Sequence, residues 1–165
     1  MPAKLPNIQA CVFDAYGTLF DVNSAASAAQ SELGENWRPL ADLWRAKQLQ
    51  YTWLRSLSGR YADFWQVTGD ALDFAMQHFH HSDPALRSRL MNLYLTLTPY
   101  SEVPEVLQRL KSAGLKQAIL SNGTPAMLTA AAANAGVAAH LDGADADLAG
   151  RPALDRAPGT DVLDV

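Results

Sequence analysis

The sequence contains a single cysteine and no long apolar run. Cys11 is the only cysteine among the 165 residues, which excludes an intrachain disulfide and any CxxC motif. We read Cys11 as a small buried apolar residue. No stretch of about 18 apolar residues is present, and the first ten residues, MPAKLPNIQA, lack the pattern of a signal peptide. We therefore expect a soluble cytoplasmic protein with no membrane partner.

Positive charge is also scarce. The chain has 13 Lys and Arg against 17 Asp and Glu, a formal net charge of −4. This balance provides no basic surface for nucleic acid. A small anion would need a local binding site.

Aromatic residues are missing from the last third of the chain. All 14 of them, 5 Phe, 4 Trp and 5 Tyr, lie at or before Tyr100, and the last lysine is Lys116. The apolar fraction of 48% is nevertheless enough for one globular core. The two ends of the chain thus differ in composition.

Two short apolar runs predict strands that end in polar residues. Residues 8–13, IQACVF, lead into Asp14, and residues 117–120 lead into Ser121 and Asn122. Open α/β sheets place their chemistry at the carboxyl ends of such strands.

Helical periodicity fills the space between the two strands. Apolar spacing of 3.6 residues predicts helices over 40–57, 61–79, 83–97 and 103–110, and Thr124 with Pro125 predicts the start of another. The order strand, helical insert, helix, strand, helix indicates an α/β fold, with a Rossmann-like parallel-sheet core, incomplete here, and an inserted helical cap.

This order implies three parts. We assign residues 1–20 and 99–141 to a partial α/β core, 21–98 to the helical cap, and 142–165 to an unplaced tail. A sheet of two strands would expose an edge and part of its apolar face.

Asp14 is the first candidate for chemistry. A carboxylate at a strand end can bind a metal or attack an electrophilic carbon, although an isolated Asp there is more often a turn or cap residue. Gly17 permits a sharp turn. The Thr18 hydroxyl could donate to Asp14, or cap a helix.

These residues carry a resemblance. The segment FDAYGTLFDV, residues 13–22, resembles the first motif of the haloacid dehalogenase superfamily, and its L-2-haloacid dehalogenase branch in particular. The resemblance implies that Asp14 is the nucleophile. It places Tyr16 where phosphatases carry a second Asp beside magnesium, so it argues against a phosphatase and implies no metal or other cofactor.

The segment LWRAKQLQYTWLRSLSGRYADFW, residues 43–65, resembles the cap of the same branch. The resemblance implies that Arg45 receives the substrate carboxylate or the leaving halide, and that Tyr16, Leu49 and Phe64 form an apolar pocket. From spacing alone, Arg45 could equally be a solvated charge, and the aromatic residues could be packing. Ala46 departs from the Gln usual in relatives.

The segment LSNG, residues 120–123, resembles the second motif of the superfamily. The resemblance implies that Ser121 and Asn122 bind the substrate carboxylate, with Asn122 also near the halide. Taken alone, the tripeptide is simply a turn.

Two other polar clusters could mimic a metal site. The first consists of His78, His80 and His81; we interpret it as a helix end, where the helix dipole favours cations. The second consists of Asp142, Asp145 and Asp147; we interpret it as a solvated loop.

Two features of the branch have no counterpart. Relatives carry a Lys in a Tyr-Lys-Pro context and a later Ser/Asn/Asp loop, whereas Arg151 before Pro152 is the nearest match here, and Arg differs from Lys in shape and direction. The resemblance fades after residue 138 and covers about residues 8–141. We therefore expect a truncated or frame-shifted member.

The resemblance implies hydrolytic dehalogenation of L-2-haloalkanoic acids to D-2-hydroxy acids through an aspartyl ester on Asp14, impaired by the missing motifs. The partners would be the 2-haloacid and halide, and the resemblance also suggests a homodimer. Two alternatives stay open: an inactive remnant or non-catalytic interaction protein, and a phosphatase of the superfamily.

Overall fold

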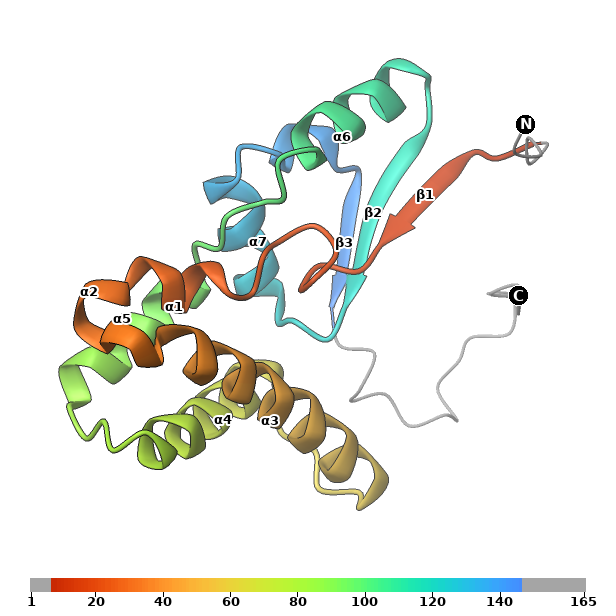
Figure 1. The fold of residues 1–165 in the computed structure, drawn as a ribbon. Coiled ribbons are helices and arrows are strands. Elements are labelled where there is room, and N and C mark those ends of the chain that lie inside the picture. Colours follow the sequence, from red (N-terminus) through yellow and green to blue (C-terminus); the bar gives the residue numbers. More distant parts are fainter. Residues whose placement is uncertain (1–6, 147–165) are drawn as a thin grey trace, which may run out of the picture.

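A parallel sheet of three strands forms the centre of the fold. The computed structural model describes residues 7–146 (Figure 1). Strands β1 (Ala10–Phe13), β2 (Lys116–Ser121) and β3 (Gly143–Ala146) lie in the order β1-β2-β3. All three therefore end at the same edge of the sheet.

The described part of the chain contains seven α-helices, of which only α6 and α7 lie against the sheet (Figure 1). Figure 1 shows α3 and α4 beyond the carboxyl ends of the strands, whereas α6 and α7 lie beside the sheet. Short 3-10 turns occupy residues 34–36 and 138–140. The α-helices are α1 (Ser24–Ala28), α2 (Gln30–Leu33), α3 (Trp37–Leu57), α4 (Phe64–His78), α5 (Pro84–Tyr94), α6 (Val103–Ser112) and α7 (Pro125–Asn134).

The expected order of elements is confirmed, and local capping explains the helix starts. The Asp63 carboxylate accepts from the backbone N–H of Gln66, so α4 begins three residues later than its periodicity predicts. Thr124 caps α7 in the same manner, with Pro125 in the first turn. Helices α1 and α2 were not predicted, because their short Ala-rich segments lack an apolar period.

The expectation of two strands is wrong. Strand β3 pairs with β2, with Ser121 opposite Ala146, so Asp145 does lie on a strand. The start of β3 is fixed by Asp142, whose carboxylate accepts from the backbone N–H of Gln117. This hydrogen bond lowers the pKa of Asp142.

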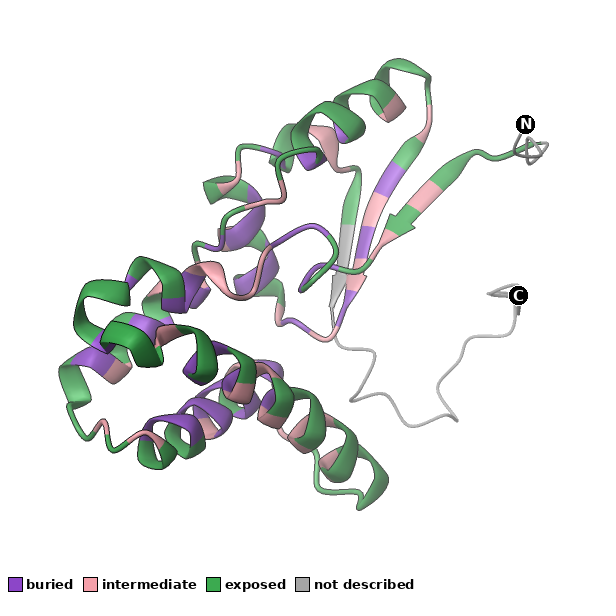
Figure 2. Ribbon diagram, viewed as in Figure 1, coloured by how far each residue is buried: buried purple, intermediate pink, exposed green. Residues whose placement is uncertain are grey.

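Strand β1 lies at the edge of the sheet and is only partly covered. Val12 on this strand and Ile8 before it are 58% and 47% exposed, so part of the apolar face beside this edge is uncovered, as expected. Cys11 is partly buried, not buried as predicted. The main core instead lies on the inner faces of the helices, as Figure 2 shows.

A buried amide ties the sheet to the helices beside it. Gln117 on β2 is fully buried, and its Nε2 donates to the carbonyl oxygens of Leu107 on α6 (2.8 Å) and His140 (3.2 Å). These bonds hold α6 and the second 3-10 turn against β2.

Within residues 7–146, no helix combines the length and apolarity needed to span a bilayer.

Candidate active site

The carboxyl ends of β1 and β2 bring two predicted site segments to one edge of the sheet. Asp14 follows β1 directly, and Ser121 ends the neighbouring parallel strand β2. The register pairs Phe13 with Ile119, so Asp14 lies beside the end of β2. The Asp14 side chain is exposed and that of Ser121 is buried. The site therefore contains an accessible carboxylate beside a partly enclosed polar loop.

A tight turn after Asp14 takes the chain away from the sheet. The Ala15 carbonyl accepts from the backbone N–H groups of Leu19 (2.9 Å) and Phe20 (3.0 Å). Gly17 has φ of 96°, a conformation that glycine adopts without strain. Thr18 is exposed on this turn, and no hydrogen bond joins its hydroxyl to Asp14. The proposed support of Asp14 by Thr18 thus stays a prediction.

Arg45 reaches this turn from α3. Its Nη2 donates to the Tyr16 carbonyl oxygen at 2.7 Å, and its Nη1 donates to Gln48 Oε1 at 2.8 Å. The side chain is therefore not simply a solvated charge on a helix. A permanent cation lies next to the loop that carries Asp14.

Tyr16 is buried in an aromatic cluster between the turn and the helices. Its ring centroid lies 5.3 Å from that of Phe64 and 5.5 Å from that of Tyr94. Burial, with smaller contributions from Tyr94 and Asp14, raises the pKa of Tyr16 well above its ordinary value. The phenol is therefore neutral at physiological pH. It has no hydrogen-bond partner among the described residues.

The β2–α7 loop packs directly on the Tyr16 ring. A Cβ atom at Gly123 would lie 2.6 Å from Tyr16 Cε2 and 3.1 Å from both Tyr16 Oη and Leu128 Cδ2. Real Cβ atoms do not approach a ring so closely. Gly123 thus permits the contact between the loop and Tyr16.

The substitution Gly123→Ala is expected to lower the free energy of unfolding by roughly 1–3 kcal/mol, because the Tyr16 ring or the loop must shift. Chemical denaturation of both proteins measures the difference. Gly143→Ala is the control, because a Cβ atom there would meet no atom within 4 Å. Equal losses in the two variants would contradict the packing argument.

A pocket opens where α3, the start of α4 and the β2–α7 loop meet. Two predicted site residues, Phe64 and Asn122, line it. Leu49 is 39% exposed and does not line it. The full lining is Thr52, Arg55, Ser56, Tyr61, Ala62, Phe64, Val67 and Asn122.

Sequence reasoning missed the buried polar residues behind Arg45. Gln48 is fully buried on α3, and its Oε1 accepts from Tyr94 Oη at 3.1 Å as well as from Arg45. Its Nε2 donates to Thr68 Oγ1 at 2.6 Å. The sequence feature that could have predicted this contact is the spacing of three residues between Arg45 and Gln48, which places both side chains on the same helix face.

Tyr94 provides a test at alkaline pH. Burial raises its pKa to about 12, above the value of about 10 in an unfolded chain. The unfolded chain therefore loses this proton first, so the stability from Tyr94 is complete below about pH 10 and is lost as the pH rises toward 12.

At neutral pH, Tyr94→Phe is expected to be less stable than the wild type by about 1 kcal/mol, because the hydrogen bond to Gln48 is lost. Above about pH 10 the two free energies of unfolding should converge, because only the wild type titrates at this position. Urea unfolding at several pH values checks this. A difference that stays constant up to about pH 11 would contradict the raised pKa.

The three histidines His78, His80 and His81 form no metal site in the described part of the chain. Among residues 7–146, no group of three His, Cys, Asp or Glu side chains is arranged to hold a metal ion. His78 ends α4 and packs edge-on against Phe79. Asp147 lies outside the described residues.

Comparison with known proteins decides the family. The family model for haloacid dehalogenase-like hydrolases matches residues 8–154. The chain belongs to this family. The match extends to residue 154, past residue 141, where the motif resemblance to the L-2-haloacid dehalogenase branch ends.

Relatives of this haloacid dehalogenase-like chain are named for one activity. It is 50% identical over 126 residues to (S)-2-haloacid dehalogenase 4A of Burkholderia cepacia, covering 76% of this chain and 54% of the relative. It is 47% identical over 136 residues to (S)-2-haloacid dehalogenase of Pseudomonas sp. (strain YL), covering 82% and 59%. The chain thus spans little more than half the length of these relatives.

Solved structures agree with the α/β fold. A dehalogenase crystal structure matches with a TM-score of 0.84 and 45% identity, covering 87% of this chain and 64% of that one. The L-2-haloacid dehalogenase of Xanthobacter autotrophicus, with chloropropionic acid covalently bound, matches with a TM-score of 0.77 and 44% identity, covering 84% and 56%.

Proposed function

We propose that this chain carries the nucleophile and the anion-binding side chains of an L-2-haloacid dehalogenase, which hydrolyses L-2-haloalkanoates to D-2-hydroxy acids and halide. The names of the relatives support this reaction class, and so does the covalently bound chloropropionic acid in a related structure. The identity to these relatives is 44–50%.

In the proposed reaction the Asp14 carboxylate attacks C2 of the substrate from the side opposite the halogen. The C2–halogen bond breaks, halide leaves with the bonding electrons, and an ester with inverted configuration forms. Water then attacks the acyl carbon of the ester, which releases the hydroxy acid and regenerates Asp14. The exposed position of Asp14 after β1 suits it to meet a small substrate.

The remaining proposed roles are those of binding. Arg45 receives the carboxylate or the departing halide, and Ser121 and Asn122 bind the carboxylate. Tyr16 and Phe64, which are in ring contact, supply an apolar wall. The wall would exclude water from the reacting carbon. Leu49 is proposed to extend this apolar wall, and the Thr18 hydroxyl is proposed to donate to the Asp14 carboxylate.

The position of Arg45 is the observation that carries the proposal. Its guanidinium is bonded to the carbonyl of Tyr16, two residues from Asp14. A substrate anion attracted to this cation would bring its C2 atom to the Asp14 side of the turn. Tyr16 stands where a phosphatase would need a second carboxylate, so a metal-dependent phosphatase is disfavoured.

We also propose that residues 21–98 act as a cap over a core formed by residues 1–20 and 99–141, and that the protein pairs as a homodimer. The cap assignment is supported by α3 and α4, which lie beyond the carboxyl ends of the strands (Figure 1). Substrate would then bind between the two parts.

Halide release from L-2-chloropropionate in the presence of a chelator tests the proposal. A dehalogenase releases chloride from the L-enantiomer without added metal. Hydrolysis of p-nitrophenyl phosphate with magnesium would instead identify a phosphatase. If the folded protein gives neither product, the non-catalytic alternative stands and the proposed function fails.

A further inference from the structure

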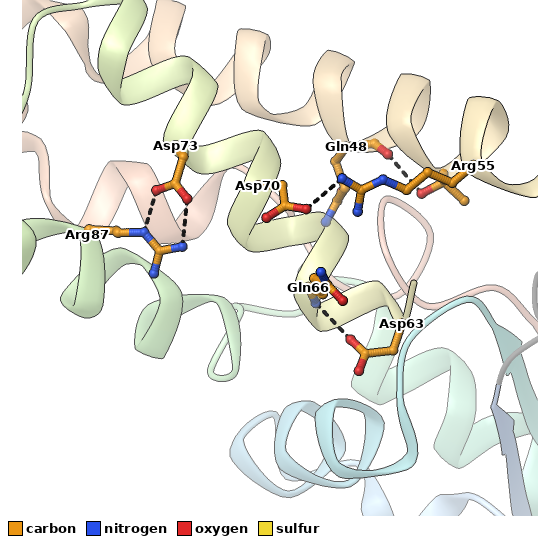
Figure 3. Close-up of polar contacts among 8 residues, drawn as sticks. Gln48, Arg55, Asp63, Gln66, Asp70, Asp73 and Arg87 are labelled. Atoms are coloured by element: carbon orange, nitrogen blue, oxygen red, sulfur yellow. Dashed lines mark hydrogen bonds and ion pairs between the residues drawn. The ribbon is translucent and has the colours of Figure 1, made fainter. Parts of the chain in front are cut away.

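Arg45 differs from its neighbours in the kind of partner it has. Among the described residues it forms no ion pair: it donates to two neutral oxygens, those of the Tyr16 carbonyl and the Gln48 amide, and it also lies close to the neutral Tyr94 hydroxyl. Five other arginines each pair with a carboxylate, two of them in Figure 3. The pairs are Arg38–Asp42, Arg55–Asp70, Arg87–Asp73, Arg89–Glu32 and Arg109–Glu105.

The hydrogen bonds fix which way the Gln48 amide faces. Thr68 Oγ1 donates to the Phe64 carbonyl at 2.6 Å, so it must accept from Gln48 Nε2 at 2.6 Å. Gln48 Oε1 therefore faces the two donors, Arg45 Nη1 and Tyr94 Oη. A single arrangement of donors and acceptors satisfies every bond in this buried network.

The surrounding helices hold the network in place. Trp44 Nε1 donates to the Thr68 carbonyl at 2.9 Å, which joins α3 to α4. Gln48 and Thr68 are both fully buried. The amide is thus rigid, and it holds one edge of the guanidinium while Tyr16 holds the other.

We propose that Gln48 is a positioning residue for Arg45: its neutral amide fixes the guanidinium beside the Asp14 turn and leaves its positive charge uncompensated for an anionic group of the substrate or for the departing halide. This inference rests on the proposed function, in which Arg45 receives that anion. A carboxylate in the same place would hold the guanidinium equally well but would neutralise it.

The substitution Gln48→Glu places a negative charge beside Arg45 in a side chain of nearly the same shape, and it also removes the bond that Gln48 Nε2 donates to Thr68 Oγ1. Glu has the same size as Gln, and one of its oxygens can still accept from Arg45. Gln50→Glu is the matched control, because Gln50 is exposed on the same helix, where it accepts from Lys47 Nζ. Both variants change the net charge by the same amount.

Affinity is measured by calorimetry with L-2-chloropropionate, in an Asp14→Asn background that cannot turn the ligand over. We expect Gln48→Glu to weaken binding of the ligand roughly 10- to 100-fold, which is the range for loss of a charged hydrogen bond between Arg45 and the anionic group of the ligand. Gln50→Glu should stay within about twofold of the parent protein. In Gln48→Glu protein that keeps Asp14, the outcome depends on which anion Arg45 receives. If it receives the substrate carboxylate, KM should rise by a larger factor than kcat falls; if it receives the departing halide, the fall in kcat should be the larger effect. Equal affinities of Gln48→Glu and Gln50→Glu would overturn the inference.

A second readout does not depend on a ligand. In ¹⁵N NMR spectra, the Arg45 Nη–H groups should exchange slowly with solvent in the wild type and rapidly in Gln48→Met, which keeps a side chain of similar length but removes the acceptor. Circular dichroism establishes that each variant is folded. If no chloride is released but both readouts respond to Gln48, the proposed function fails and the positioning role stands. Unchanged Nη–H exchange in folded Gln48→Met would refute the positioning role.

Discussion

Asp14→Asn is expected to abolish chloride release from L-2-chloropropionate, with a loss on the order of 10³-fold or more. The amide is nearly the same size as the carboxylate but is a poor nucleophile. The side chain is exposed, so the free energy of unfolding should change by no more than about 0.5 kcal/mol. Activity is therefore lost without loss of the fold.

Isotope labelling ties this loss to the ester intermediate. A single turnover of the wild type in H₂¹⁸O should place ¹⁸O in the Asp14 carboxylate, because water attacks the acyl carbon of the ester and not C2. Mass spectrometry of the peptide containing Asp14 detects the label. Asp42→Asn, an exposed change on α3, is the control and should retain full turnover. Unchanged turnover in Asp14→Asn would remove Asp14 from the mechanism.

Arg45→Lys is expected to lower kcat/KM by roughly 10²- to 10³-fold, although the positive charge is retained. The guanidinium donates to Tyr16 O and Gln48 Oε1 through two different nitrogens. A lysine ammonium carries its three N–H donors on one nitrogen, so it cannot reach both of these separated acceptors and also face an anion.

Steady-state kinetics with chloride, the halide product, as an inhibitor measure this effect. If Arg45 receives the halide, inhibition by chloride should weaken and kcat should fall, whereas a carboxylate role would raise KM and spare kcat. Arg38→Lys on the same helix is the control, because Arg38 is exposed and paired with Asp42. Wild-type kinetics in Arg45→Lys would show that the site does not need a guanidinium that donates through two separate nitrogens.

Local signals in the sequence predicted much of the fold. The cap Thr124 followed by Pro125 fixes the start of α7 through neighbouring residues alone. Strand β3 escaped prediction because the segment Gly-Ala-Asp-Ala has little intrinsic preference for a strand. Its hydrogen bonds to β2, on residues more than twenty positions earlier, create it.

In the candidate site, too, local motifs could be predicted from the sequence, whereas contacts between distant residues could not. Motif resemblance named Asp14 and Arg45 as candidate site residues, but the contact between Arg45 and the Tyr16 carbonyl joins residues 29 positions apart and depends on the turn at Gly17. The buried role of Gln48 was equally hidden. A glutamine on a helix is usually solvated, and only the meeting of α3, α4 and α5 surrounds this one with partners.

The contact between Tyr16 and Gly123 restricts how this chain can diverge. Since Cβ at position 123 would overlap the Tyr16 ring, a larger residue at 123 requires a smaller one at 16. Packing thus couples the two positions, one in each motif, in one direction: a side chain at 123 needs space that the Tyr16 ring now fills. Exchange of Tyr16 for a smaller acidic residue would leave a gap over Gly123, so such a change in this chain requires repacking of the β2–α7 loop as well as accommodation of a new charge.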